Sequence, residues 1–197
     1  MILIRHKQRD YMSDISKIER TIVINLIGAP STGKSTIASE LFAKMKWEGY
    51  DVELVSEYAK ELVWEERHET FKNELYLFAK QHHRMFRLNR KVKYIVTDRP
   101  LILSMFYNQK YGNSSETFNN LVREEVLNYE NWNVFLERTK PYNPKGRNQT
   151  EEESNEFAKE MFSKLYDEVC DRRMILKAIE GFTSETIFRM IKNKEGN

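Results

Sequence analysis

Residues 28–35 read GAPSTGKS and follow the pattern G-x-x-x-x-G-K-[ST]. Glycines allow a tight turn in which successive backbone N–H groups converge on an anion, and a helix beginning near Lys34 adds the positive end of its dipole. In such a loop the lysine reaches the β- and γ-phosphates and the Ser35 hydroxyl binds Mg²⁺. We therefore predict that ATP or GTP binds, with Mg²⁺, to Gly28, Ala29, Pro30, Ser31, Thr32, Gly33, Lys34, Ser35 and Thr36.

This loop leaves the acceptor of the phosphoryl group open, because water and a hydroxyl group are both suitable. Ligands of open parallel sheets bind beyond the carboxyl ends of the strands. Charged segments follow three of the predicted strands, at residues 56–58, 98–100 and 137–140. Carboxylates combined with arginines at these ends favour phosphoryl transfer to a hydroxyl, since such transfer needs a base, a Mg²⁺ ligand and compensating positive charge.

Glu57 and Asp98 are the candidate catalytic carboxylates. We predict that Glu57 takes the proton of the acceptor; the alternative is an acid that only stabilises the first turn of the next helix. Asp98 is predicted to organise Mg²⁺, directly or through water, and the alternative is a loop aspartate paired with Arg99. Arg99 is predicted to stabilise the charge on the moving phosphoryl group.

Gln81 shares a helical stripe with the apolar residues Leu77, Met85 and Leu88. A buried amide needs hydrogen-bond partners, and a planar ligand such as a base offers both a donor and an acceptor. The alternative is an amide at the edge of the stripe that faces water. The neighbouring residues 82 and 83 are both histidines, but they lack the spacing of metal ligands.

Two further segments are basic. Residues 138–149 contain Arg138, Lys145 and Arg147 together with two prolines and a glycine. We predict a small lid of which Arg138, Lys145 or Arg147 closes on the phosphates, with a solvated loop as the alternative. The second segment, residues 84–93, holds five basic residues. It is predicted to be a solvated helix end, and a nucleic-acid surface is the alternative.

The elements that would position these residues alternate between strand and helix. Apolar and β-branched runs predict five strands, at residues 21–27, 51–55, 94–97, 134–136 and 174–176. Apolar residues at helical spacing predict helices that begin at Lys34 and cover residues 71–92, 116–129 and 183–192. A capping box at Thr150 and Glu153 opens one more helix. Its apolar stripe is expected at Ala158, Phe162, Leu165 and Val169.

This alternation predicts an α/β fold with a parallel sheet of about five strands and helices on both faces. We expect one domain over residues 21–197, preceded by an N-terminal extension at residues 1–20. The aromatic-rich helices leave a homodimer open, although core packing explains the same stripes.

Composition excludes several classes of protein. The 197 residues include 32 basic and 30 acidic ones, a net charge of +2 that does not by itself indicate a nucleic-acid-binding protein. The single Cys170 excludes an intrachain disulfide and a multi-cysteine zinc site. Apolar runs stay well short of the roughly 20 residues of a membrane span, and a secretory signal is absent. We expect a cytoplasmic protein without a membrane partner.

The motifs above resemble those of small P-loop kinases. The loop at Gly28, the SEYAKE run at residues 56–61, Gln81, Asp98 and the Gly-Arg at residues 146–147 are similar in order and spacing to those of ribosylnicotinamide kinases, often grouped with AAA-like ATPase domains. Lys60 and Pro100 differ from the usual family residues. This resemblance implies the three-layer sandwich of P-loop NTPases.

The chain is also similar to deoxynucleoside kinases, in which a glutamate acts as base, a glutamine on a long helix reads the nucleobase and an arginine-bearing lid covers ATP. The resemblance then implies an acceptor site at Glu57, Tyr58, Gln81 and Arg99. Phage-encoded kinases of hydroxymethylpyrimidines in DNA are similar as well. We therefore expect an ATP-dependent kinase of a nucleoside-like small molecule, with modified DNA as one alternative acceptor and a regulatory P-loop ATPase as another reading.

Overall fold

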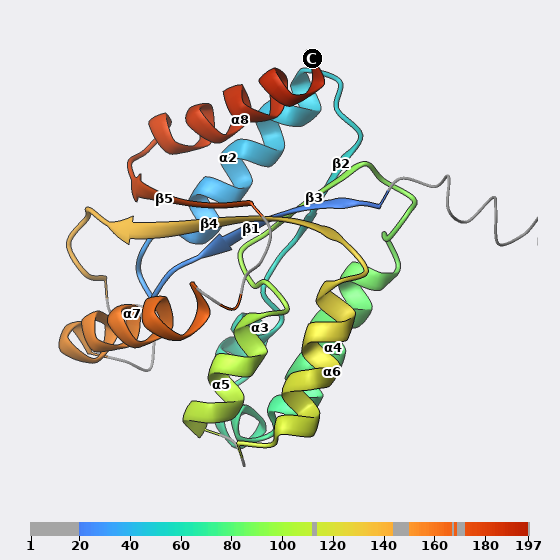
Figure 1. Ribbon diagram of the computed structural model, residues 1–197. Helices are drawn as coiled ribbons and strands as arrows, with labels where there is room; N and C mark the ends of the chain where they lie inside the picture. The colour runs from blue at the N-terminus through green and yellow to red at the C-terminus, as the bar shows by residue number, and fades with distance from the viewer. Residues whose placement is uncertain (1–19, 112–113, 144–149, 167, 169–171, 197) are drawn as a thin grey trace, which may run out of the picture.

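The computed structural model describes residues 20–111, 114–143, 150–166, 168 and 172–196. Its centre is a sheet of five parallel strands in the order β2-β3-β1-β4-β5 (Figure 1). The strands are β1 (Ile22–Ile27), β2 (Val52–Val55), β3 (Tyr94–Thr97), β4 (Glu130–Arg138) and β5 (Arg172–Ala178). Because all strands point the same way, the segments that follow β1, β2 and β3 meet at one edge of the sheet.

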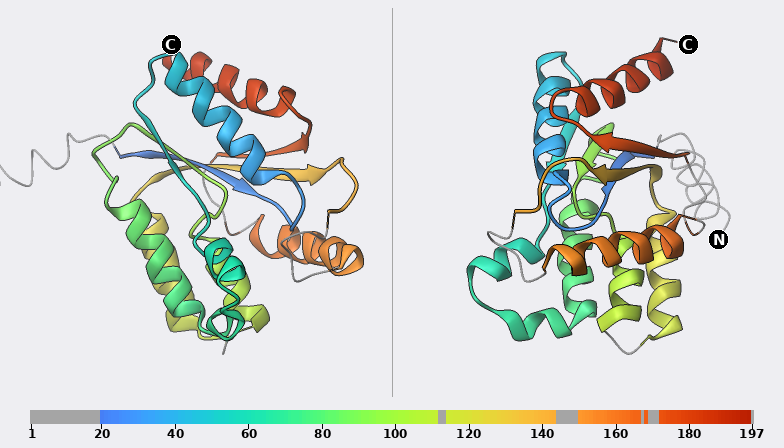
Figure 2. Two further views of the ribbon diagram at one scale, coloured as in Figure 1. Left: turned by 180° about the vertical axis from the view of Figure 1, so that it is seen from behind. Right: turned by 90° about the vertical axis from the view of Figure 1, so that its left-hand side faces the viewer.

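Helices cover both faces of this sheet. They are α2 (Lys34–Trp47), α3 (Ala59–Trp64), the short 3₁₀ helix η1 (His68–Lys72), α4 (Glu74–Phe86), α5 (Leu103–Tyr111), α6 (Glu116–Val126), α7 (Glu151–Leu165) and α8 (Phe182–Glu195). α2 and α8 lie together on one face, whereas α4, α5, α6 and α7 lie on the other (Figures 1 and 2). None of these described helices has both the length and the apolar character needed to cross a membrane. The three layers confirm the predicted fold class.

The central strand β1 shows why these layers form. Its six residues are all buried, as expected of a parallel strand covered on both faces. Val23 and Ile27 belong to the core under α4 to α7, while Ile24 and Leu26 belong to the core under α2 and α8. Alternate side chains of β1 therefore pack into two separate cores. The strand ends just before Gly28, the glycine that opens the phosphate loop.

The structure corrects several predicted boundaries. β4 begins at Glu130, well before the predicted 134–136, because Asn131 and Asn133 interrupt the apolar pattern yet are buried and hydrogen-bonded to Asn25. Glu137 and Arg138 consequently lie inside the strand, not after it. The helix expected over residues 71–92 is shorter, since η1 precedes it, Asn73 caps it and turns follow its end at Phe86.

Two further corrections concern helices. α3 and α5 were not predicted, because neither shows a clear apolar stripe in the sequence. α7 exists as expected, but the buried side of the helix differs from the predicted stripe: Phe162 is 39% exposed and Val169 lies outside the described residues. The buried residues of α7 are Ser154, Phe157, Met161 and Leu165.

The capping box of α7 is confirmed in both directions. Thr150 Oγ1 accepts from the Glu153 N–H at 3.2 Å, and the Glu153 carboxylate accepts from the Thr150 N–H at 2.7 Å. We expect Thr150→Ala to lower the free energy of unfolding by about 1 kcal/mol, because one N–H at the helix start loses its acceptor. Urea unfolding of the two proteins measures this difference. Equal midpoints would show that α7 does not need the cap.

Candidate functional site

The loop between β1 and α2 is curled tightly by its own residues. Ser31 and Gly33 have φ angles of 66° and 96°, in the left-handed region that glycine adopts freely. Thr32 Oγ1 donates to the Ala29 carbonyl at 2.6 Å and closes the turn. A Cβ added at Gly28 would lie only 3.2 Å from the Leu136 carbonyl oxygen, so this glycine permits the close approach of β4. The backbone has the curvature of an anion-binding loop.

Lys34, at the start of α2, turns back over this loop. Its Nζ donates to the carbonyl oxygens of Gly28 at 2.7 Å and Ala29 at 3.1 Å. The ammonium group therefore lies on the concave side of the turn, where a bound phosphate chain would need positive charge. Ser35 and Thr36 follow in the first turn of α2, and both are exposed.

Asp98 joins the loop to the end of β2. The side chain is 3% exposed, and its Oδ2 accepts from the Ser35 hydroxyl at 2.5 Å. Its Oδ1 accepts from the backbone N–H of Glu57 at 2.9 Å. One buried carboxylate thus contacts two of the predicted site segments, and the expected convergence of strand ends is observed. Asp98 does not make the predicted alternative pair with Arg99, whose carboxylate partner is Glu74.

Gln81 holds the same segment from the side of α4. Its Oε1 accepts from the Tyr58 N–H at 3.0 Å, and its Nε2 donates to the Ser56 carbonyl at 3.4 Å. The amide is 2% exposed, so the predicted alternative of a water-facing glutamine is wrong. Both polar ends of Gln81 contact the backbone on either side of Glu57, and the glutamine therefore positions that residue.

The side chain of Tyr58, the residue after Glu57, contacts side chains of α4. The side chain is half-buried, and its hydroxyl lies 2.9 Å from the hydroxyl of Tyr76. The guanidinium carbon of Arg84 lies 5.0 Å from the centre of the Tyr58 ring, and Arg84 forms an ion pair with Glu61 at 2.7 Å. An aromatic ring beside Glu57 is therefore held by Tyr76 at its hydroxyl group and by Arg84 over the ring.

Behind Glu57 lies a buried group of charges that sequence analysis found only in part. Arg99 pairs with Glu74 at 3.1 Å, and its guanidinium carbon lies 4.1 Å from the centre of the Tyr107 ring. Burial raises the pKa of the Glu74 carboxyl above its usual value, although Arg99 opposes this, and burial raises the pKa of Tyr107 as well. The charge of Glu57 adds to both upward pKa shifts, so Glu57 acts electrostatically on this group.

Glu74 and Tyr107 are the site residues that the sequence did not reveal. Glu74 stands in the first turn of α4, where an acid is common on an exposed helix end, and nothing in the pattern signals that it is buried. Tyr107 lies on α5, a helix that was itself not predicted. A buried ion pair between residues as distant in sequence as Glu74 and Arg99 can be recognised only in the tertiary structure.

The predicted lid region contacts the phosphate loop at its described end. The N–H of Asn143 donates to the Ser31 hydroxyl at 3.0 Å, and the Ser154 hydroxyl of α7 donates to the Pro30 carbonyl at 2.9 Å. Arg138 ends β4 and pairs with Glu151 at 2.9 Å. Lys145 and Arg147 lie outside the described residues, so their predicted contact with phosphates remains a prediction.

The second basic segment is mostly exposed. Lys93 pairs with Glu195 at 2.5 Å, whereas Arg87, Arg90 and Lys91 lie on the surface near the end of α4. His82 contacts Glu125 at 2.9 Å. Within the described ranges, no cluster of three or more His, Cys, Asp or Glu side chains has the arrangement of a metal site.

The Ser35–Asp98 pair nevertheless fits a magnesium ion. Mg²⁺ prefers oxygen ligands and is usually bound through one or two carboxylates together with substrate phosphates and waters. The Ser35 hydroxyl and the Asp98 carboxylate lie within hydrogen-bond distance of each other beside the loop. In nucleotide-binding sites of this kind, the protein usually contributes one hydroxyl and one carboxylate oxygen as Mg²⁺ ligands, and both are present at that position.

Comparisons with known proteins agree with this arrangement. The family model described as "AAA domain" matches residues 23–178. A solved structure of NadR protein in complex with NR is 19% identical, with a TM-score of 0.57 over 82% of this chain and 44% of that chain. NadR protein in complex with NAD and AMP-PNP is 17% identical, with a TM-score of 0.60 over 90% of this chain and 50% of that chain.

The chain thus spans about half the length of these two solved structures, or less. At such low identity the likeness shows a shared fold. A comparison with curated protein sequences finds no match. The family match and the shared fold confirm the resemblance that the phosphate loop and the strand ends predicted.

Proposed function

Since the chain belongs to the AAA domain family, we propose that it is a Mg²⁺- and ATP-dependent phosphotransferase that moves the γ-phosphoryl group to a hydroxyl of a nucleoside- or nucleotide-like acceptor. One observation carries the proposal: Asp98 contacts Ser35 of the phosphate loop and the backbone of Glu57 with its two carboxylate oxygens. This contact fixes the backbone of a second acidic residue next to the nucleotide loop. An acidic residue at this place can take the proton of an acceptor hydroxyl, which supports transfer to an acceptor.

In this proposal, each charged residue of the site has a distinct role in the transfer. Glu57 accepts the proton of the attacking hydroxyl as that oxygen approaches the γ-phosphorus. Lys34 and the enclosed guanidinium of Arg99 compensate the negative charge of the moving phosphoryl group. Arg138 and Arg147 contribute further positive charge when the lid closes. Ser35 and Asp98 would hold Mg²⁺, and this ion would neutralise charge on the phosphate oxygens when bound. Because Arg99 is buried and paired, it acts as a fixed charge.

The acceptor lies, in this proposal, against Glu57 and Tyr58, whose backbone Gln81 holds in place, and the buried Arg99 lies behind them. Support for a nucleoside-like acceptor comes from the half-exposed Tyr58 ring next to Glu57, on which a flat base packs favourably. The NadR structures, whose bound molecules are NR in one case and NAD and AMP-PNP in the other, share the fold and support a nucleotide site.

A screen of acceptors tests this function. Purified protein with Mg²⁺ and ATP is incubated with nucleosides, nucleotides, nicotinamide riboside and hydroxymethylpyrimidine DNA, and formation of ADP is measured. We expect one class to raise ADP formation well above the acceptor-free rate. If ADP forms at the same rate with every acceptor and with none, the protein is an ATPase and the proposal is wrong.

The DNA alternative has its own supporting observation, the exposed Arg87, Arg90 and Lys91 near the end of α4. A polyanion bound there would release counterions, so its affinity would fall steeply with salt. A small neutral acceptor lacks this dependence. Measuring the Michaelis constant of the best acceptor between low and high salt therefore separates the two candidates.

Gln81 offers a test of how Glu57 is positioned. We expect Gln81→Leu to lower kcat for every acceptor, because the N–H of Tyr58 loses its partner and the segment shifts. The stability cost is about 1–3 kcal/mol. Gln109→Leu, at an exposed position of α5, is the control and should change neither value. A raised Michaelis constant at unchanged kcat, confined to acceptors with one type of base, would instead show that Gln81 reads the base.

A further inference from the structure

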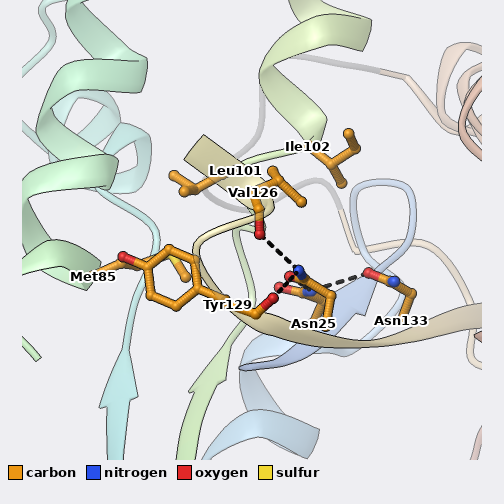
Figure 3. Close-up of a pocket in the computed structure, with 8 residues that line it drawn as sticks. Asn25, Met85, Leu101, Ile102, Val126, Tyr129 and Asn133 are labelled. Carbon is orange, nitrogen blue, oxygen red and sulfur yellow. Dashed lines mark hydrogen bonds between the residues drawn. The ribbon is translucent and has the colours of Figure 1, made fainter. Parts of the chain in front are cut away.

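Three buried asparagines of β1 and β4, Asn25, Asn131 and Asn133, meet on the face of the sheet that α4 to α7 cover. Figure 3 shows Asn25 and Asn133 in this group. Asn25 lies opposite Asn133 in the register of the two strands. Its Nδ2 donates to the Oδ1 atoms of Asn131 and Asn133, each at 3.0 Å. The Nδ2 of Asn131 donates in turn to the carbonyl oxygens of Val126 at 2.9 Å and Tyr129 at 3.3 Å. These carbonyl acceptors fix the orientation of the Asn131 amide, which fixes the orientation of the other two.

Two of the three side-chain amides, those of Asn25 and Asn133, use only one of their two polar groups in this network. Within the part of the chain that the structure describes, the Oδ1 of Asn25 and the Nδ2 of Asn133 have no protein hydrogen-bond partner. Both residues are deeply buried, at 3% and 2% exposure. Buried amides are nearly always hydrogen-bonded to protein or to ordered water, because an unpaired polar group in the interior is costly.

A small cavity lies at the same place. It is lined by the three asparagines and by apolar side chains that include Met85, Leu101 and Ile102 (Figure 3). It offers about 10 Å³ to the centre of a water molecule. A single buried water needs about 10–15 Å³ on this measure, together with two to four polar partners. The size excludes any larger ligand, and the amides distinguish this cavity from the purely apolar ones that stay dry.

We propose that one structural water molecule binds in this cavity, donates to the Oδ1 of Asn25 and accepts from the Nδ2 of Asn133. The water completes the hydrogen bonding of the amide network. It also bridges β1, which leads into the phosphate loop, and β4, which packs against Gly28. A slip of one residue between these strands would move Asn133 to the other face of the sheet and break the network, so the site favours the observed register.

A crystal structure at a resolution that shows ordered waters tests the site without any variant. We expect one fully occupied water at about 2.7–3.2 Å from both Asn25 Oδ1 and Asn133 Nδ2. In solution, the same water should give a cross-relaxation signal to the side-chain amide protons of Asn133. An empty cavity in the crystal structure, or amides that pair with each other and fill it, would overturn the proposal.

A pair of variants separates the water from ordinary packing. Asn133→Val removes both the water's donor and one acceptor of Asn25, so we expect loss of the water and a thermal midpoint lowered by about 3–9 °C. Asn119→Val is the control, because Asn119 is equally buried and bonded to Asn108 but lines no part of the cavity. It should lose stability and keep the water. Retention of the water in Asn133→Val would contradict the assigned contacts.

Discussion

We expect Glu57→Gln to lower phosphoryl transfer by about 10²–10⁴-fold, the usual contribution of a general base, and to leave the affinity for ATP unchanged. Glutamine keeps the size of the side chain but cannot take the proton of the attacking hydroxyl. The backbone N–H of residue 57 still donates to Asp98, so the segment keeps its place. Single-turnover transfer measured beside ATP titration separates the chemical step from nucleotide binding.

Glu61→Gln is the matched control for this prediction. Glu61 stands one turn further along, in α3, and its exposed carboxylate pairs with Arg84. Its loss removes the same charge from the same region without touching the proposed base, so transfer should stay within about twofold, as for an exposed ion pair worth little energy. If both variants lose transfer equally, Glu57 contributes charge only; if neither does, the assignment of the base is wrong.

Asp98→Asn is expected to have the second large effect, a loss of transfer by about 10²–10³-fold, comparable with removal of one group that stabilises the transition state. Asparagine keeps one oxygen but loses the negative charge that the Ser35 hydroxyl and a bound Mg²⁺ require. The change therefore affects the nucleotide loop and the segment of Glu57 together. Transfer rates measured over a range of Mg²⁺ concentrations should show a weaker apparent affinity for the metal.

Asp51→Asn provides the comparison. Asp51 also accepts a backbone N–H, that of Lys93 at 3.0 Å, but it lies at the opposite end of the strands and is exposed. It should leave the Mg²⁺ dependence unchanged. A wild-type Mg²⁺ dependence in Asp98→Asn would contradict the proposed role of Asp98 and leave it as a structural link between two loops.

The sequence predicted the parts of this site that lie next to strands. Gly28, Glu57 and Asp98 each follow a short buried strand that is recognisable from its apolar residues, and parallel strands bring their ends together. Helical spacing placed Gln81 on an apolar stripe but left open whether its amide is buried, and the structure buries it. What Gln81 contacts was not predictable, because hydrogen bonds to the backbone of a distant segment leave no periodic signal.

Other parts depended on burial of polar residues, which a hydrophobic pattern cannot express. Glu74 and Arg99 are buried as a pair, and the sequence predicted Arg99 as a site residue without indicating that Glu74 is its buried partner. The predicted β4 was too short for the same reason. Asn131 and Asn133 look like exposed polar residues in the sequence, but they are buried and hydrogen-bonded to Asn25 on the neighbouring strand. The buried side of α7 also includes the polar Ser154, whose hydroxyl donates to the Pro30 carbonyl of the phosphate loop.

The fate of the γ-phosphoryl group tests the central claim most directly. ATP labelled at the γ-phosphate is incubated with the protein, Mg²⁺ and the acceptor that best raises ADP formation, and the products are separated. The proposed mechanism predicts that the label appears in a phosphomonoester of the acceptor, in equal amount to the ADP formed. Label found only in inorganic phosphate, with the acceptor unchanged, would contradict it.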